Sequence, residues 1–228
     1  TAYEIRLSLV GSEMCIRDRD TELILIALPN EQVAEWVCKL ANHKALILDV
    51  ASVKAEILKR VESELGELPI NYVPCHPIAG SEKAGPSTSH PALFENRPVV
   101  IIPHQKQRPG SRELVTEFWS QLNSICVELT GEEHVFILAK TSHLPNVLSY
   151  AFMSMLSGDD LSYSGSGLDD FTRIAGANPE MWWAIFSLNE TGLSKAMDSF
   201  QQTFNKLRSA ILKKDQQTAL EIMNSAYI

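Results

Sequence analysis

Histidine and carboxylate side chains stand close together in residues 76–82, beside residues that fix the backbone. His76 follows the apolar run 70–73, which is typical of a buried strand, and Pro77 comes directly after it. A neutral imidazole can accept a proton near pH 7, so His76 is a candidate general base, and Glu82 adds a carboxylate within a turn of it. On this segment alone, a solvated loop histidine held by turn residues is the simpler interpretation.

Two segments further along the chain carry groups that could bind charge. Ser142 and His143 precede a strongly apolar helical pattern, where a histidine satisfied by backbone groups is the plainer explanation. Arg173 offers a planar guanidinium, which matches a carboxylate through two parallel hydrogen bonds. A structural ion pair with Asp169 or Asp170 is the competing explanation of this arginine.

The elements that must position these side chains begin with two continuous apolar runs, residues 21–28 and 45–50. Both runs predict strands that are covered on both faces of a parallel sheet. Asn30 would cap an amphipathic helix after the first run, and Ser52 would cap a helix over residues 53–65 after the second. With the run before His76, the order strand–helix–strand–helix–strand is the doubly wound α/β pattern.

The rest of the chain changes character near Thr130. Strands are expected at residues 99–102 and 125–129, and beyond Gly131 apolar residues recur at helical spacing. Pro145 would interrupt the hydrogen bonds of a helix that passes through it, and the resulting kink is expected to turn Ser142 and His143 toward a cleft. A near-heptad stripe suits burial against another helix, including one from a second subunit. Its members are Leu193, Met197, Phe200, Phe204, Leu207 and Ile211.

Composition excludes several classes of function. The 228 residues are 45% hydrophobic, which supports a sizeable core, and the net charge of −8 argues against a nucleic-acid surface. No apolar run is long enough for a membrane span, and no secretory signal is visible. The four cysteines form no CxxC pair, so we expect reduced thiols in a cytoplasmic protein. The six histidines lack zinc-ligand spacing, so no metal is predicted.

Four segments occur together in one order: residues 49–54, 76–82, 141–146 and 170–175. In order and spacing they resemble the prephenate and arogenate dehydrogenases of tyrosine biosynthesis, the TyrA family, over the chain from about residue 21 onward. The resemblance implies an α/β fold, an incomplete doubly wound parallel (Rossmann-like) sheet followed by an all-α C-terminal dimerisation domain. It implies oxidative decarboxylation of prephenate to 4-hydroxyphenylpyruvate, with hydride transfer to NAD or NADP, by a cytoplasmic homodimer joined through its C-terminal helices.

The same resemblance divides the chain and suggests roles for its side chains. Residues 21–130 would be a partial dinucleotide-binding domain, and residues 131–228 a helical substrate-binding and dimerisation domain. Residues 1–20 form an unreliable N-terminal segment that belongs to neither domain. His76 would be the catalytic base, and Ser52 would position it or the substrate hydroxyl. Arg173 would clamp a substrate carboxylate. The other implied contacts are His143, Ser142, Asn146 and Glu82 for the substrate, and Leu28, Pro29 and Ser52 for the cofactor.

The sequence departs from the family pattern at three places. Family members begin with a strand, a GxGxxG turn and a helix, whereas Gly11 stands alone here, so we expect the first half of the dinucleotide domain to be missing. Asn146 stands where the family usually has a second histidine, and an amide cannot carry charge. Asp169 stands where many relatives have a basic residue. Arogenate as substrate, and a non-catalytic helical dimerisation module with a decayed dinucleotide domain, remain as alternatives, and the choice between NAD and NADP stays open.

Overall fold

The computed structural model describes residues 21–80 and 90–226 of the chain. These residues form two compact units, the first holding residues 21–80 and 90–130 and the second residues 131–226. Residues 1–20, with Gly11, and residues 81–89, with Glu82, lie outside the described part, and the expectations for them stay predictions.

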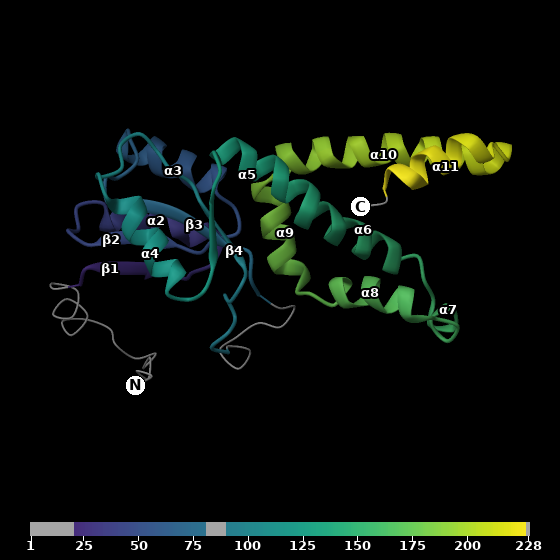
Figure 1. Cartoon of the computed structure of the whole chain (residues 1–228), viewed down its shortest axis with the longest axis horizontal. Coiled ribbons are helices and arrows are strands. Elements are labelled where there is room, and N and C mark those ends of the chain that lie inside the picture. The colour runs from purple at the N-terminus through teal and green to yellow at the C-terminus, as the bar shows by residue number, and fades with distance from the viewer. Residues whose placement is uncertain (1–20, 81–89, 227–228) are drawn as a thin grey trace. The chain divides into compact units, whose positions relative to one another are not determined.

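The first unit is built on a five-stranded sheet in the order β1-β2-β3-β4-β5. Figure 1 labels β1 to β4 together with the helices α2, α3 and α4 of this unit. Its strands are β1 (Leu23–Ile26), β2 (Leu46–Asp49), β3 (Tyr72–Pro77), β4 (Pro98–Ile101) and β5 (Ile125–Glu128). The strands β1, β2 and β3 are parallel, β4 runs antiparallel to β3, and β5 is parallel to β4. The expected fold class is therefore confirmed, with one reversal inside the sheet. An antiparallel neighbour needs no crossover helix, and the described residues between β3 and β4 contain none.

Successive strand residues point to opposite faces, and each face has its own core. On one face, α2 (Asn30–Leu40) and α3 (Ala55–Leu65) cover a cluster that includes Ile26, Ile47 and Tyr72. On the other, α4 (Ser111–Ser120) places Val115 and Trp119 against a cluster that includes Leu48, Val73 and Cys75. Helices on both faces of the sheet make this unit doubly wound.

Two strands differ from the sequence-based expectation. β1 is shorter than residues 21–28, and Leu25 is 42% exposed because β1 is the terminal strand of the described sheet. β3 begins later than expected because the Tyr72 N–H donates to the Pro69 carbonyl in a turn, which leaves Ile70 53% exposed. The strand then continues to Pro77, so His76 belongs to the strand itself.

The predicted helix caps were wrong. α2 begins at Asn30 itself, and α3 begins three residues after Ser52, with no side-chain cap on either helix. The Asn30 side chain instead accepts a hydrogen bond from the Ser52 backbone N–H at 3.0 Å. The side chain of Asn30 therefore bonds to the turn after β2, and neither Asn30 nor Ser52 caps the helix that follows it.

The second unit is entirely helical over residues 131–226 (Figure 1). In chain order it contains α5 (Gly131–Leu138), the π-helical turn η2 (Ala139–His143), α6 (Leu144–Met153), α7 (Gly158–Leu161), α8 (Ser166–Ala175), α9 (Pro179–Leu188), α10 (Glu190–Lys213) and α11 (Gln216–Ser225). Helix α8 packs on α6, and α11 folds back against α10. Over the described ranges, no helix combines the length and apolarity that a bilayer crossing would need.

Candidate active site

The turn between β2 and α3 is shaped by a buried charge network. The Asp49 carboxylate, which has no exposed surface, accepts hydrogen bonds from the Ala51 backbone N–H at 2.9 Å and from the Tyr72 hydroxyl at 2.7 Å. The equally buried Lys54 ammonium forms an ion pair with the same carboxylate. Residues on both sides of Ser52 are therefore anchored to one buried group.

This network also sets the ionisation of its neighbours. Burial, and then the Asp49 carboxylate, raise the pKa of the Tyr72 hydroxyl well above its ordinary value. Burial and Asp49 also raise the pKa of the Cys75 thiol to about 12. Tyr72 therefore remains a neutral hydrogen-bond donor, and Cys75 is an unreactive thiol of the core.

Ser52 and the segment after β1 are joined at one edge of the sheet. β1 and β2 are parallel neighbours in which Ile26 pairs with Asp49, so the turns that follow them leave from the same edge. Leu28 and Pro29 are exposed there, and Ser52 is half-buried. Ligands of open α/β sheets bind outside the carboxyl ends of the strands. The structure thus brings together the three residues expected to contact a cofactor.

His76 lies near the carboxyl end of β3, at the same edge of the sheet as the Ser52 turn, because β2 and β3 are parallel. It is only 7% exposed, and in the sheet it pairs with Val100 of the antiparallel strand β4. The interpretation as a solvated loop histidine was therefore wrong. A buried imidazole at the same edge of the sheet as a half-buried, hydroxyl-bearing turn suits proton transfer.

The π-helical turn η2 stands just before Pro145, between α5 and α6, and Pro145 itself lies in the first turn of α6. The predicted break in α-helical geometry next to Pro145 thus takes the form of a π turn, a feature often found at functional sites. Asn146 is buried, and its side-chain amide donates to the Ser142 carbonyl at 3.0 Å. Ser142 is half-buried, and His143 completes the turn.

His143 is held inside the helical unit. The residue is 2% exposed, its Nδ1 lies 2.9 Å from the Nδ2 of Asn189, and the Trp182 ring approaches it edge to face with centroids 6.3 Å apart. Burial lowers the pKa of His143 to about 4, so the imidazole is neutral near pH 7. Sequence reasoning missed Asn189, because no local pattern links it to a histidine 46 positions earlier.

Arg173 lies in the last turn of α8 and is exposed. No ion pair joins it to Asp169 or Asp170, although all three belong to the same described helix. The interpretation as a structural ion pair was therefore wrong, and its guanidinium is available to a ligand. Asp169 and Asp170 are likewise exposed within one turn of it.

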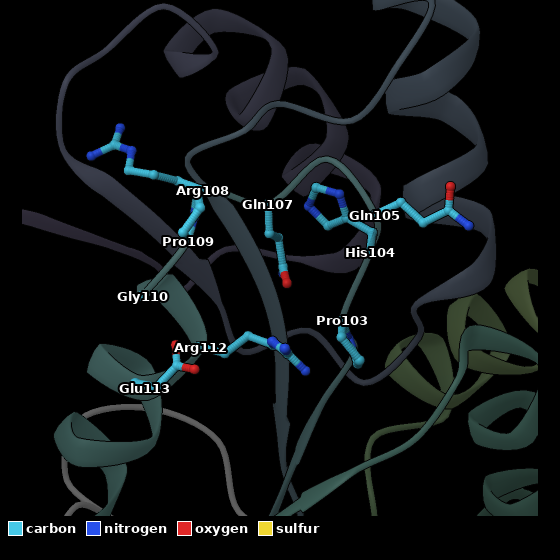
Figure 2. Close-up of a pocket in the computed structure, with 9 residues that line it drawn as sticks. All are labelled: Pro103, His104, Gln105, Gln107, Arg108, Pro109, Gly110, Arg112 and Glu113. Carbon is cyan, nitrogen blue, oxygen red and sulfur yellow. The ribbon is translucent and has the colours of Figure 1, made fainter.

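A pocket of about 560 Å³ follows β4 and contains none of the predicted site residues (Figure 2). His104 in its wall bonds to the Tyr72 carbonyl at 2.9 Å, so this pocket lies beside the amino end of β3, at the opposite end of the strand from His76. Figure 2 shows the side chain of Arg108 directed away from that of Arg112. Arg112 is already paired with Glu128 at 3.2 Å.

In the described residues, no group of three His, Cys, Asp or Glu side chains could hold a metal ion.

A doubly wound sheet with a serine turn and a histidine at its carboxyl-terminal edge, followed by an all-helical unit, defines a two-domain α/β protein with a Rossmann-like first unit. Two family models agree with this class. The model described as "Prephenate dehydrogenase, nucleotide-binding domain" matches residues 10–128, and "Prephenate dehydrogenase, dimerization domain" matches residues 130–225. The chain belongs to the prephenate dehydrogenase family.

Individual relatives point the same way. The chain is 30% identical to cyclohexadienyl dehydrogenase of Zymomonas mobilis, over 89% of this chain and 72% of that protein. It is 26% identical to prephenate dehydrogenase of Bacillus subtilis, over 91% of this chain and 58% of that protein. The structure of A. aeolicus prephenate dehydrogenase, in complex with hydroxyphenyl propionate and NAD+, superimposes with a TM-score of 0.84 at 28% identity, covering 95% of this chain and 78% of the other. These matches confirm the predicted family, and with it the predicted enzyme class of NAD(P)-linked oxidoreductases.

Proposed function

We propose that this protein oxidatively decarboxylates prephenate to 4-hydroxyphenylpyruvate, with NAD or NADP as hydride acceptor. The observation that carries the proposal is the position of His76, a buried histidine at the same carboxyl-terminal edge of the sheet as Ser52, in a chain that matches both domains of the family. Relatives extend beyond the part matched here, since the chain spans 72% and 58% of the two proteins named above.

The reaction requires a base, a hydride acceptor and a positive charge. His76 accepts the proton of the C4 hydroxyl while the C4 hydrogen leaves as hydride. The ketone-like ring then loses its carboxylate as carbon dioxide, and the electron pair of the broken bond makes the ring aromatic. The ring oxygen regains a proton and becomes the phenol. Ser52 positions the imidazole or the C4 hydroxyl. General-base assistance of this kind contributes about 10²–10⁴-fold to the rate.

The substrate's carboxylates need a partner that carries charge permanently. Arg173 is exposed and makes no ion pair with Asp169 or Asp170, which suits a two-bond clamp on a carboxylate. His143, Ser142 and Asn146 lie on and beside the π turn and would line the substrate site as uncharged groups. Glu82, outside the described residues, would contact the substrate and orient or electrostatically tune the site.

NAD or NADP supplies the hydride acceptor when it is bound. The exposed apolar surface of Leu28 and Pro29, beside the half-buried Ser52, fits the nicotinamide end of such a molecule. Residues 21–65 contain no glycine, so these residues do not include the phosphate-binding loop of the fold. The residues described at this edge would therefore hold the reacting end of the cofactor.

Arogenate is the second candidate substrate, and one observation favours it. Asp169 and Asp170 are exposed within a turn of Arg173. Arogenate carries an ammonium where prephenate carries a keto group, and carboxylates next to the clamp would attract that charge. The test is NAD(P)H formation by the full-length protein with each substrate. A higher kcat/KM for prephenate supports the proposal, a higher value for arogenate supports the second candidate, and no turnover with either favours the non-catalytic dimerisation module.

The C-terminal helices would join two copies of the protein in the cytoplasm. The matched dimerisation domain covers α10 and α11, and both helices expose large apolar side chains. These are Met197, Phe200, Phe204, Ile211, Leu212, Leu220 and Met223. Burial against a second copy would remove this surface from water. Light scattering that gave the monomer mass at micromolar concentration would contradict the homodimer.

A further inference from the structure

Asn189 stands between α9 and α10 and reaches back to the π turn. It is 5% exposed, and its Nδ2 lies 3.1 Å from the Val135 carbonyl oxygen and 2.9 Å from the Nδ1 of His143. A side-chain amide has two N–H groups on one end and an oxygen on the other. Both contacts of Asn189 are made by the same end.

The Val135 contact determines which end that is. A backbone carbonyl can only accept, so the group beside it must be the NH2 of Asn189 and not its oxygen. Of the two amide hydrogens, one is donated to Val135 and the other to His143. Nδ1 of His143 must then accept, and in a neutral imidazole the proton is left on Nε2.

The start of α10 lies close to this amide at Gly192. A Cβ added to Gly192 would lie 2.8 Å from Oδ1 of Asn189 and 2.9 Å from the Val135 carbonyl oxygen. Only a residue without a side chain lets α10 approach both groups so closely. Asn189, Val135 and Gly192 therefore form one close contact, which leaves no space for a side chain at position 192.

We infer that Asn189 is a positioning residue that holds His143 as the neutral tautomer protonated on Nε2, so that His143 donates a hydrogen bond to an oxygen of the substrate. This inference rests on the proposed function, in which His143 lines the substrate site. The burial of His143 supports this inference. Burial lowers the pKa of the imidazole to about 4, so the ring is uncharged near pH 7. His143 is thus a hydrogen-bond donor, and the role of base is left to His76.

Nitrogen NMR of the unmodified, ¹⁵N-labelled protein tests the tautomer without substrate and without substitution. The His143 signals, identified by their loss in His143→Gln, are expected to show an unprotonated Nδ1 and a protonated Nε2 at pH 7. A protonated Nδ1, alone or in an imidazolium, would overturn the inference. This measurement does not depend on turnover, so its failure can be told apart from failure of the proposed function.

A double-mutant cycle tests whether Asn189 affects substrate binding through His143. Asn189→Ala is expected to raise KM for prephenate about tenfold with little change in kcat, a factor that corresponds to about 1.4 kcal/mol. In the His143→Gln background the same substitution should change KM less than twofold, because its target is gone. Equal effects in both backgrounds would contradict a positioning role. Asn178→Ala is the matched control, since Asn178 caps α9 through the N–H groups of Glu180 and Met181 and should leave KM unchanged.

Discussion

Lys54 and Asp49 form an ion pair in which both side chains are fully buried. Asp49 is the last residue of β2 and Lys54 directly precedes α3, so the ion pair joins the two ends of the turn that contains Ser52 and stabilises that turn. The Tyr72 hydroxyl and the Ala51 N–H complete the hydrogen bonds to the carboxylate. A buried carboxylate with this many partners is stable only while all of them remain.

Lys54→Met is expected to destabilise the first unit by about 3–5 kcal/mol, because it leaves the Asp49 charge buried without a counter-ion. Urea unfolding followed by circular dichroism measures the change. The matched control is Lys39→Met, which breaks an exposed ion pair with Glu35 and should cost at most about 1 kcal/mol. If the two variants lost the same free energy of unfolding, the buried ion pair would contribute no more to stability than the exposed one.

His76→Asn is expected to lower kcat for prephenate by about 10²–10⁴-fold while KM changes little, since asparagine keeps a hydrogen-bonding side chain but cannot accept a proton near pH 7. Steady-state NAD(P)H formation in the full-length protein is the measurement. His90→Asn is the control, because His90 is an exposed histidine of the same unit. Wild-type turnover in His76→Asn would refute the base assignment.

Arg173→Lys keeps the positive charge and removes the planar fork. We expect KM for prephenate to rise about tenfold, because one of two charge-assisted hydrogen bonds is lost. The melting temperature should stay the same, since Arg173 has no ion pair with Asp169 or Asp170 to lose. Arg60→Lys, at an exposed ion pair with Glu56 in α3, should alter neither KM nor kcat. A lower melting temperature with unchanged KM would return Arg173 to a structural role.

Stability should fall as the pH is lowered, because His143 is buried in its neutral form. Its folded pKa of about 4 lies below the ordinary value of 6.5, so between these values the unfolded chain binds more protons than the folded one. Unfolding free energy is therefore lost from pH 7 toward pH 4, by up to about 3 kcal/mol from this group. Urea unfolding at pH 7 and pH 5 measures the loss, and it should be smaller in His143→Gln. Identical pH dependence in both proteins would exclude His143 as its source.

Several features could be predicted from local sequence alone. Apolar runs such as 45–50 predicted strands, and helical spacing after Gly131 predicted an all-helical unit, because both patterns arise from which residues must leave water. The motifs around Ser52, His76, and Arg173 predicted the family, since their order along the chain needs no knowledge of contacts.

Other features were decided only by residues that are distant in sequence. Asn30 and Ser52 both look like helix caps, yet they bond to each other across two turns. His76 looked like a loop histidine until the pairing of β3 with β4 placed it inside a strand. A cap or a loop is defined by a few neighbouring residues, whereas these contacts depend on which strands lie side by side.

The protonation state of His143 shows most clearly which properties the sequence determined and which the tertiary structure decided. The sequence determined that a histidine precedes Pro145 at the start of an apolar helix. Its burial, its lowered pKa and the amide of Asn189 at its Nδ1 were decided by the packing of α10 against η2. Protonation depends on the atoms that surround a ring, and those atoms come from a residue 46 positions away that only the folded chain brings near.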